Sequence, residues 1–443
     1  MHMTPIMQLL PAILLLSVFQ QMAHAADQQP PGYGAEPRIP PPQESWIPTV
    51  KWSVASEPWA PGMTPKPAPG LIVQAFAQGL KHPRWLHVLS NGDVLVAEAA
   101  SEPAASWWPR AVAQNWVQRR SGSVTENANR ISLLRDNNGD GVADQTGVFL
   151  DGLRQPFGMA LIGDQLYVAN TDSVVRFPYK AGQTRITEKG TKLLDLPVGH
   201  HWTRALLVST DASKLYVTVG SGSNIGEKGM DIEAGRATIL ELDLATGKSR
   251  IFASGLRNAN GMAFEPTTGA LWTVVNERDE IGDDTPPDYL TSVKDGGFYG
   301  WPYSYWGKTV DTRVQPQRPD LVASAITPDY GLGGHTASLG LAYYDGAALP
   351  EQFKNGMIIG QHGSWNRSVY SGYKVIFVPF KDGRPNGPPV DVLTGFLKED
   401  GSGKAHGRPV GVAVDGKGAL LVADDTGNTI WRVTAASRNS QSR

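Results

Sequence analysis

The segment Arg408-Pro-Val-Gly-Val-Ala-Val-Asp-Gly-Lys-Gly-Ala-Leu-Leu-Val-Ala-Asp-Asp-Thr-Gly-Asn-Thr-Ile-Trp-Arg-Val433 contains three short apolar runs separated by glycine-containing turns. Such runs are typical of β-hairpins. Related units, each with a small-residue approach, a strand, a turn and a second strand, occur at six places in the chain. They begin at residues 83, 155, 203, 258, 335 and 408.

Six units of this kind predict an all-β fold, a six-bladed β-propeller with long inserted loops, because one unit supplies the hairpins of one four-stranded blade. The 49 glycines and 33 prolines among 443 residues agree with this, since helix interiors exclude both residue types. The alternative is a β-sandwich built from generic hairpins. In a propeller the residues just before each first strand meet at one axial mouth, so functional side chains are expected there.

The N-terminal segment carries an export pattern. An apolar run from about Met7 to Phe19 is followed by Ala23-His24-Ala25, which predicts a signal peptide over residues 1–25. The run is too short to span a bilayer, so we expect a periplasmic or secreted protein without stable membrane insertion. Residues 26–69 are rich in proline and are expected to form a leader, residues 70–435 the propeller, and residues 436–443 a flexible tail.

Composition excludes several function classes. The 40 Lys and Arg residues balance 42 Asp and Glu residues and the pI is near 6.5, so the chain lacks the basic surface of a nucleic-acid binder. The absence of cysteine excludes disulfides, thiolate metal sites and the cysteine-based attachment of haem. A small-molecule partner is favoured.

Histidines occur where the mouth is expected. The residues just before repeat strands include His200, His201, His335 and His406. A neutral imidazole with a pKa near the working pH is the usual base for a sugar or alcohol hydroxyl. The alternative for each is a hydrogen-bonded loop histidine. His82 and His87, which flank Trp85, are interpreted as structural.

Arginines follow the same placement, namely Arg204, Arg257, Arg367 and Arg408. Several guanidinium groups around one mouth suit a planar ligand with several carboxylates, which arginine binds in a bidentate manner. The alternative is that each arginine caps carbonyl groups of its own loop.

Five segments together resemble the soluble pyrroloquinoline quinone (PQQ) sugar dehydrogenases, in particular the branch of L-sorbosone and pyranose dehydrogenases. The resemblance runs from about Pro69 to Val433. The segments are GHHWTR (199–204), KLYVTVGSGSN (214–224), GLRNANGMAFEPTTGALW (255–272), NERDEIGDDTPPDYLTSVKDGGFYGWPYSYWG (276–307) and GQHGSWNRS (360–368).

The resemblance implies PQQ lying across the mouth with a calcium ion beside it. In that family a histidine takes the proton from the C1 hydroxyl of the sugar while hydride passes to the quinone. Here the base falls in residues 199–204. We favour His201, because it directly precedes Trp-Thr-Arg, and a different alignment register selects His200.

The resemblance also implies cofactor and substrate contacts. Arg257 and Asn258 match the pair that holds the carboxylates of PQQ, Thr336 matches a hydroxyl contact, and Gln155 matches a residue that contacts substrate. Two further arginines complete the expected cofactor contacts. Arg408 matches the first of two family arginines, and because Val410 stands where the second would be, we expect Arg367 to share this role.

Two calcium sites are considered. The resemblance places backbone carbonyls of Arg278 and Asp279 on calcium, although this loop contains an insertion relative to the glucose branch. Calcium accepts carbonyl oxygens as well as carboxylates, so the assignment is chemically sensible. The segment Asp136–Asp144 has the spacing of the first half of an EF-hand loop, but Gly147 stands where the bidentate glutamate would be. The alternative there is a tight turn rich in Asp and Asn.

The expected function is that of a PQQ- and calcium-dependent dehydrogenase that oxidises an aldose or a related, sorbosone-like aldehyde. A separate quinone or cytochrome must collect the electrons, because the chain has no haem motif. The alternatives are a calcium-dependent lactonase of the gluconolactonase type and a ligand-binding propeller without enzymatic activity.

Overall fold

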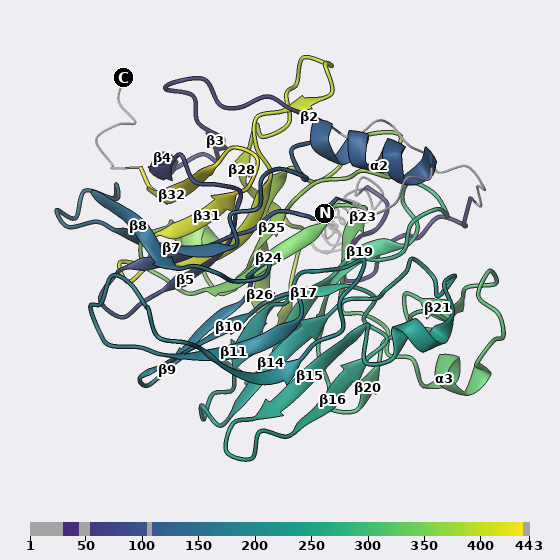
Figure 1. The fold of residues 1–443 in the computed structure, drawn as a ribbon. Coiled ribbons are helices and arrows are strands. Elements are labelled where there is room, and N and C mark those ends of the chain that lie inside the picture. The colour runs from purple at the N-terminus through teal and green to yellow at the C-terminus, as the bar shows by residue number, and fades with distance from the viewer. Residues whose placement is uncertain (1–29, 44–53, 104–108, 437–443) are drawn as a thin grey trace, which may run out of the picture.

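The six repeated units form the first two strands of six sheets. The computed structural model describes residues 30–43, 54–103 and 109–436, so the signal peptide predicted over residues 1–25 and most of the predicted tail lie outside the described residues. The sheets surround a central axis as the blades of a six-bladed β-propeller (Figure 1). The predicted fold class is therefore confirmed.

Blades 1 to 3 follow one another along the chain. Blade 1 contains β5 (Pro83–Val88), β6 (Val94–Glu98), β7 (Arg130–Arg135) and β8 (Gln145–Leu150). Blade 2 contains β9 (Met159–Ile162), β10 (Gln165–Ala169), β11 (Ser173–Pro178) and β12 (Thr191–Asp195). Blade 3 contains β13 (Leu206–Val208), β14 (Lys214–Val219), β15 (Thr238–Asp243) and β16 (Ser249–Ser254), extended by β20 (Gly297–Phe298).

Blades 4 to 6 complete the ring. Blade 4 contains β17 (Ala259–Phe264), β18 (Leu271–Val275), β19 (Pro287–Ser292) and β23 (Tyr330–Gly334). Blade 5 contains β24 (Ser338–Tyr344), β25 (Gly356–Gln361), β26 (Lys374–Lys381) and β28 (Val390–Thr394), and β27 (Arg384–Pro385) pairs with β26. Blade 6 contains β30 (Pro409–Val414), β31 (Leu420–Asp424) and β32 (Thr429–Ala435), and its outermost strand is β4 (Leu71–Gln78).

The strand β4 closes the ring. It pairs antiparallel with β32 over most of its length, so the two ends of the propeller are joined within blade 6. The leader before β4 adds three short strands to the body. These are β1 (Tyr33–Gly34) on β23, β2 (Ala55–Ser56) on β29 (Lys404–Ala405), and β3 (Lys66–Pro67) on β28.

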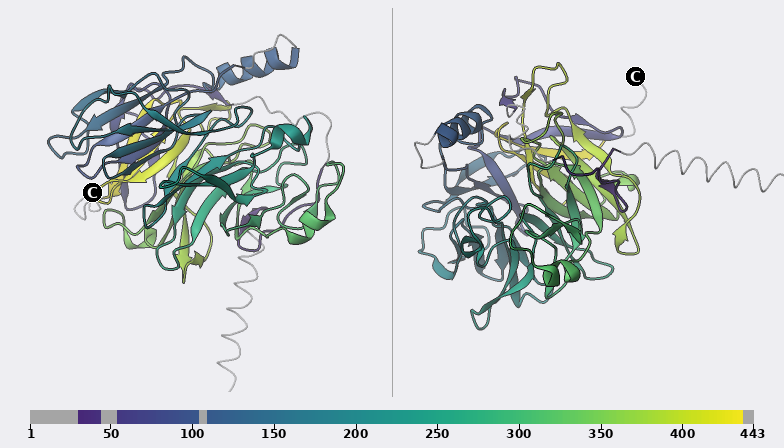
Figure 2. Two further views of the ribbon diagram at one scale, coloured as in Figure 1. Left: turned by 60° about the horizontal axis from the view of Figure 1, so that its bottom comes forward. Right: turned by 90° about the vertical axis from the view of Figure 1, so that its right-hand side faces the viewer.

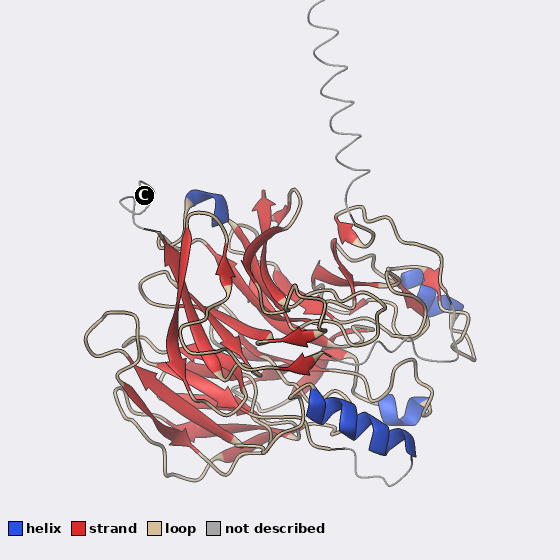
Figure 3. Ribbon diagram, turned by 90° about the horizontal axis from the view of Figure 1, so that it is seen from above, coloured by secondary structure: helices blue, strands red, loops and turns tan. Residues whose placement is uncertain are grey.

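Helices are few among the described residues and lie outside the blades (Figure 3). They are α2 (Pro109–Arg120), α3 (Pro319–Ser324) and the single turns η1 (Met230–Glu233) and η2 (Glu351–Phe353). A hairpin of two short strands, β21 (Ser304–Tyr305) and β22 (Thr309–Val310), lies near α3. The helix α2, inserted between β6 and β7, projects beyond blade 1 (Figure 2). No helix among the described residues is long and apolar enough to cross a membrane.

Glycines in the first strands allow neighbouring blades to approach. A Cβ atom on Gly340 of blade 5 would lie 2.1 Å from the carbonyl oxygen of Val410 in blade 6. A Cβ atom on Gly411 would lie 2.7 Å from the carbonyl oxygen of Arg84 in blade 1. Side chains at these positions would push the blades apart, which explains why the small-residue approach recurs in the units.

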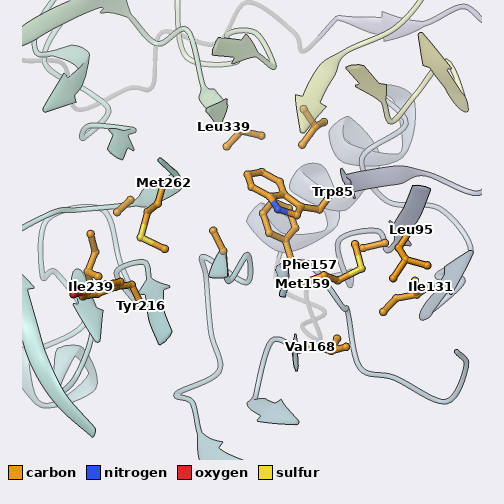
Figure 4. Close-up of a cluster of buried hydrophobic side chains, with 14 of the residues drawn as sticks. Trp85, Leu95, Ile131, Phe157, Met159, Val168, Tyr216, Ile239, Met262 and Leu339 are labelled. Atoms are coloured by element: carbon orange, nitrogen blue, oxygen red, sulfur yellow. The ribbon is translucent and has the colours of Figure 1, made fainter. Parts of the chain in front are cut away.

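The main core lies where the inner strands meet. The rings of Trp85 and Phe157 pack with their centroids 4.6 Å apart, and Figure 4 shows Met159 beside them. Met262 of blade 4 and Leu339 of blade 5 belong to the same cluster. The apolar centre therefore supports the polar loops at the mouth.

Candidate functional site

Three loops enter their first strands through a left-handed residue. The backbone angle φ is +55° at His82, +44° at Gln155 and +56° at His335. This conformation is uncommon for residues other than glycine and carries strain that the surrounding structure must balance. Its recurrence before the first strands of blades 1, 2 and 5 sets these loops apart from ordinary connections.

The contacts of His201 define its tautomer. The atom Nδ1 lies 2.9 Å from the carbonyl oxygen of Ser221 and 3.1 Å from its Oγ. Because a carbonyl oxygen only accepts hydrogen bonds, the ring proton lies on Nδ1 and Nε2 carries the lone pair. Desolvation, His200 and Arg257 lower the pKa of His201 well below its ordinary value. His201 is therefore a neutral imidazole that can accept a proton on Nε2.

The neighbouring His200 lies in a different environment. Its side chain reaches solvent, and its ring meets the ring of His201 edge to face with centroids 4.5 Å apart. Partial burial of the ring and the charge of Arg257 lower the pKa of His200 to about 4. No hydrogen bond of the described residues fixes its tautomer, so the geometry distinguishes the two histidines.

Arg204 holds the loop that carries both histidines. Its guanidinium group donates to the carbonyl oxygens of Pro197 at 2.7 Å, His201 at 2.8 Å and Thr203 at 2.8 Å. Arg204 is fully buried. It therefore caps carbonyls of its own loop and positions His201, which is the alternative role considered for these arginines.

Asn258 lies beside the histidine loop with an unsatisfied atom. Its Oδ1 is buried and has no hydrogen-bond partner among the described residues. A Cβ atom on Gly220 would lie 2.4 Å from this Oδ1 and 2.6 Å from Cβ of His201, so Asn258 and His201 face the same glycine. A buried acceptor without a partner is rare and indicates that a ligand donor belongs here.

Arg257 is bound on several sides by the protein. It donates to the carbonyl oxygen of Asn224 at 3.1 Å, to Oδ1 of Asn224 at 2.9 Å and to the carbonyl oxygen of Glu277 at 2.6 Å. Asp279 lies 3.6 Å from its Nη2. Because protein atoms already accept its hydrogen bonds, the guanidinium group contributes mainly its positive charge to the site.

Asp279 and His335 form an ion pair at the same place. Nδ1 of His335 lies 3.2 Å from Oδ1 of Asp279, and its Nε2 lies 3.0 Å from the carbonyl oxygen of Gly282. Although burial opposes both shifts, this pairing raises the pKa of His335, and it combines with Arg257 to lower the pKa of Asp279. His335 is therefore a charged partner and unsuited to be the base.

The remaining predicted cofactor residues lie on blades 4 to 6 and have partners within the protein. Thr336 is fully buried and donates to Oδ2 of Asp288 at 3.1 Å. Arg367 donates to the carbonyl oxygens of Asp283 at 3.0 Å and Val369 at 2.8 Å. Arg408 donates to the carbonyl oxygen of His362 at 3.1 Å and to Oγ of Ser123 at 3.0 Å.

A buried cluster at the mouth was not identified from the sequence. Arg84, His82 and His362 all contact Oδ2 of Asp425, the two histidines at 3.3 and 2.7 Å. Burial lowers the pKa of His82 to about 4 and that of His362 to about 3, so both are neutral. The available signal was positional, because Arg84 is the second residue of the first repeated unit and Asp425 directly follows the second strand of the sixth.

A ligand with carboxylates fits the charge of this cluster. Arg84 binds Asp425, and the charge of Arg408 acts on Arg84, so the cluster holds two arginines and one carboxylate. Arg84 Nε is buried and has no partner among the described residues. Oδ1 of Asp425 is likewise buried without a partner among the described residues, so the excess of one positive charge, rather than the unpaired donor, is what favours an anionic ligand.

One of the two predicted calcium ligands, the carbonyl oxygen of Asp279, has hydrogen-bond partners within the protein. The carbonyl oxygen of Asp279 accepts Nε and Nη2 of Arg278 at 3.0 and 2.9 Å and Nδ2 of Asn224 at 3.2 Å. The other nitrogen of Arg278 contacts Asp311. Within the part of the chain that the structure describes, no three His, Asp or Glu side chains are arranged to hold a metal ion.

The second calcium candidate forms a turn. In the loop Asp136–Asp144, Oδ1 of Asp136 accepts the amide of Gly139 at 2.7 Å, and Oδ2 of Asp144 accepts the amide of Asn137 at 2.7 Å. These bonds are those of turns stabilised by aspartate side chains.

A cavity of about 400 Å³ opens beside the histidine loop. Its lining includes Gln155, His200 and Trp202 from the mouth and Gln114 and Gln118 from α2. Nε2 of Gln155 donates to the carbonyl oxygen of Ala100 at 2.9 Å, which leaves Oε1 as the acceptor this side chain offers. The predicted substrate residue and one predicted base thus share one cavity, and His201 lies next to it.

The family model described as TrAA12-like matches residues 65–288 and 319–436. An uncharacterized protein of Borreliella burgdorferi is 30% identical over 296 residues, which are 63% of this chain and 76% of that protein. A pyrroloquinoline quinone-dependent pyranose dehydrogenase of Coprinopsis cinerea is 24% identical, with 62% of this chain and 45% of that enzyme covered. A pyrroloquinoline quinone-dependent sugar dehydrogenase of Hypocrea jecorina is also 24% identical, covering 62% of this chain and 64% of its own length.

Solved structures share the fold. The PQQ domain of pyranose dehydrogenase from Coprinopsis cinerea, in its holo form, superposes with a TM-score of 0.68 at 21% identity, covering 86% of this chain and 100% of that domain. A family AA12 enzyme of Trichoderma reesei gives a TM-score of 0.68 at 20% identity, covering 87% of this chain and 99% of that chain.

Proposed function

The chain belongs to the TrAA12-like family, and from this premise we propose that it is a PQQ-dependent dehydrogenase that oxidises a sugar. The observation that carries the proposal is the state of His201. Its proton lies on Nδ1, its Nε2 is an acceptor, and its pKa is held well below the ordinary value. The names of the fungal relatives supply the substrate class and the cofactor.

The residues of the site take the following roles in this proposal. Nε2 of His201 accepts the proton of the sugar hydroxyl. At the same time, the carbon atom that bears this hydroxyl loses its hydrogen together with two electrons, as hydride. PQQ, when bound, supplies the acceptor for that hydride. Arg204 and the carbonyl oxygen of Ser221 keep the imidazole in place, so that little reorganisation is needed when the proton moves.

We assign cofactor binding to polar groups beside His201 and to Arg408 of blade 6. We assign the buried Oδ1 of Asn258 to a donor on the cofactor, and the charges of Arg257 and Arg408 to its carboxylates. Thr336 and Arg367 hold the loops behind these contacts. Gln155 offers its amide oxygen to the substrate from the cavity wall.

The finer assignment rests on the family resemblance. We propose an aldose or a sorbosone-like aldehyde as substrate, a separate quinone or cytochrome as electron acceptor, and a periplasmic or secreted location. Calcium is proposed on the same basis, although Arg278 now occupies the carbonyl of Asp279. Treating the loaded enzyme with a calcium chelator tests this, because activity that survives the treatment would overturn the calcium proposal.

The deciding experiment is titration of the purified protein with PQQ, followed by reduction of a dye with a panel of aldoses. We expect saturable binding, and dye reduction that falls by about 100- to 10,000-fold in His201→Ala, the usual contribution of a general base. The matched variant His200→Ala should lose less than about tenfold. Failure to bind PQQ would overturn the proposal, and equal losses in both variants would overturn the choice of base.

A further inference from the structure

The cavity next to His200 has an inner and an outer wall of different origin. The inner wall consists of mouth residues, among them Gln155, His200 and Trp202. The outer wall contains Gln114 and Gln118, which come from the helix α2 that is inserted into blade 1. These glutamines are four residues apart, so both lie on the same face of the helix. The cavity volume of about 400 Å³ falls within the range of small-molecule sites.

The helix is joined to the mouth at its C-terminal end. Gly122 follows α2 and packs so closely that a Cβ atom there would lie 2.9 Å from Cγ2 of Thr426 in blade 6. Ser123 accepts a hydrogen bond from Arg408 at 3.0 Å. These contacts fix the end of the helix nearest the mouth, so Gln118 stands on a supported part of the wall.

The chemistry of the lining fits a neutral polyhydroxy ligand. Amide side chains face the cavity from both walls, and Ser101 adds a hydroxyl that accepts Nε1 of Trp202 at 3.0 Å. Of the two charged residues in the lining, Glu102 is an anion and Arg154 is a cation that already binds Asp172 at 3.1 Å. The lining therefore offers no unpaired cation to an anionic ligand, and its amide and hydroxyl groups favour a neutral one.

Trp202 supplies an apolar surface of fixed orientation. Its indole is held at one edge by Ser101, packs edge to face against Phe157 at 6.0 Å, and carries the guanidinium of Arg84 5.3 Å from its ring centre. An aromatic ring surrounded by amide and hydroxyl groups matches a sugar ring, which has apolar C–H faces and a polar edge.

The position of the cavity relative to His201 decides which part of a sugar it can hold. His200 lines the cavity, whereas His201 lies behind it, with the two rings in contact. A sugar unit whose hydroxyl reaches His201 therefore lies beside His200, which is part of the cavity wall. The lining also includes residues of α2, so a unit attached to the reacting one can contact this helix.

We propose that this cavity binds the sugar unit attached to the one that is oxidised, and that Gln114 and Gln118 are specificity-determining residues for di- or oligosaccharides. The inference rests on the proposed sugar dehydrogenase function. It deepens that function by assigning the substrate class to a part of the site that is away from the base.

The test compares a monosaccharide with disaccharides on the PQQ-loaded enzyme. In the double variant Gln114→Ala/Gln118→Ala, kcat/KM for cellobiose or maltose should fall by about tenfold or more, since each neutral hydrogen bond contributes roughly fivefold. For glucose, kcat/KM should stay within about twofold. The control Val112→Ala lies on the same helix with 54% of its side chain exposed and should change neither. Equal effects on both sugar classes, or no effect, would overturn the inference.

A binding experiment separates this inference from the proposed function. Methyl β-cellobioside and methyl β-glucoside carry no free C1 hydroxyl, so their binding by the protein, measured by calorimetry, does not depend on oxidation. We expect tighter binding of the cellobioside, lost in the double variant. If the wild type oxidises no sugar, the dehydrogenase proposal is wrong. The cavity inference is then supported by tighter binding of the cellobioside and overturned by its absence.

Discussion

At the scale of single residues, the two adjacent histidines differ because of one carbonyl group. The carbonyl oxygen of Ser221 fixes the proton of His201 on Nδ1. His200 contacts the ring of His201 and lines the cavity. A base needs a defined lone pair within reach of the substrate, and only His201 has its tautomer set by the protein among these two.

The pH dependence of the reaction reports this environment. Desolvation and the neighbouring His200 and Arg257 place the pKa of His201 well below its ordinary value, so the imidazole remains neutral as the pH falls through 6.5. We expect kcat/KM to stay level from about pH 7.5 to about pH 5.5. An ordinary histidine base would lose about tenfold per pH unit below about 6.5. Such a loss, in enzyme shown by thermal unfolding to remain folded, would contradict the assignment.

Gly220 brings Asn258 and His201 together. A methyl group there would lie 2.4 Å from Oδ1 of Asn258 and 2.6 Å from Cβ of His201, so one of the two side chains must move. A displacement of this size costs about 100-fold in rate when it affects a reacting group. We expect Gly220→Ala to lose about 100-fold in kcat with little change in melting temperature.

Gly147→Ala is the matched control, because no atom lies within 4 Å of the added methyl group. Its activity and stability should match those of the wild type. Full activity in Gly220→Ala would show that the site tolerates this displacement.

At the scale of elements, one buried carboxylate joins the leader to blade 6. Oδ2 of Asp424 accepts Nε1 of Trp59 at 2.7 Å and Nε1 of Trp431 at 3.1 Å, and Oδ1 accepts the amide of Arg408 at 2.8 Å. The ring of Trp59 also stacks on His406, whose Nδ1 lies 3.1 Å from the carbonyl oxygen of Glu57. His406 therefore helps to attach the leader to blade 6 and has a structural role.

Removal of one donor from Asp424 tests this attachment. Burial raises the pKa of Asp424 to about 6, so the group is ionised above this pH and then depends most on its donors. We expect Trp59→Phe to destabilise the protein by roughly 1.5–3 kcal/mol at about pH 8, as for a hydrogen bond to a charged group. The loss should be smaller at about pH 5, where the carboxyl group is protonated.

The measurement is the melting temperature at both pH values. Trp365→Phe changes an exposed tryptophan and should leave the melting temperature unchanged. A loss in Trp59→Phe that is equal at both pH values would show that stacking on His406 and packing, rather than the bond to Asp424, hold the leader.

At the scale of the whole molecule, local pattern predicted the blades and missed their closure. Each pair of inner strands is a hairpin, so its turn and apolar runs are visible in one short segment. The pairing of β4 with β32 joins residues more than 350 positions apart, and the segment LIVQAFAQ contains no pattern that indicates with which strand it pairs. The blade number was therefore predictable, and the ring closure was not.

The same limit applies to the site. The sequence placed Arg204 and Arg257 at equivalent positions, but the groups that their donors meet depend on how the loops fold. Arg204 binds three carbonyls of its own loop, whereas Arg257 binds loops from two neighbouring units. The cluster around Asp425 combines three blades, so single segments could not reveal it.

Ring closure makes a prediction about where the folded unit begins. The strand β4 supplies the outermost ladder of blade 6, from the pair Leu71 and Ala435 to the pair Gln78 and Thr429. The family match begins at residue 65, before this strand. A chain that starts at residue 65 keeps β3 and β4 and should fold into a monomeric ring, with a melting temperature lowered by the loss of Trp59.

A chain that starts at residue 80 should instead aggregate or melt at least about 15 °C below the chain from residue 65. Without β4, the edge of β32 is unpaired and the first and last blades are no longer joined, and an exposed edge strand favours association with other chains. Size-exclusion chromatography and thermal unfolding of the two chains measure the difference. Addition of a peptide covering residues 69–80 should partly restore the melting temperature. If the chain from residue 80 is monomeric and as stable as the longer one, then packing between blades holds the ring closed, and the ladder of β4 on β32 adds little.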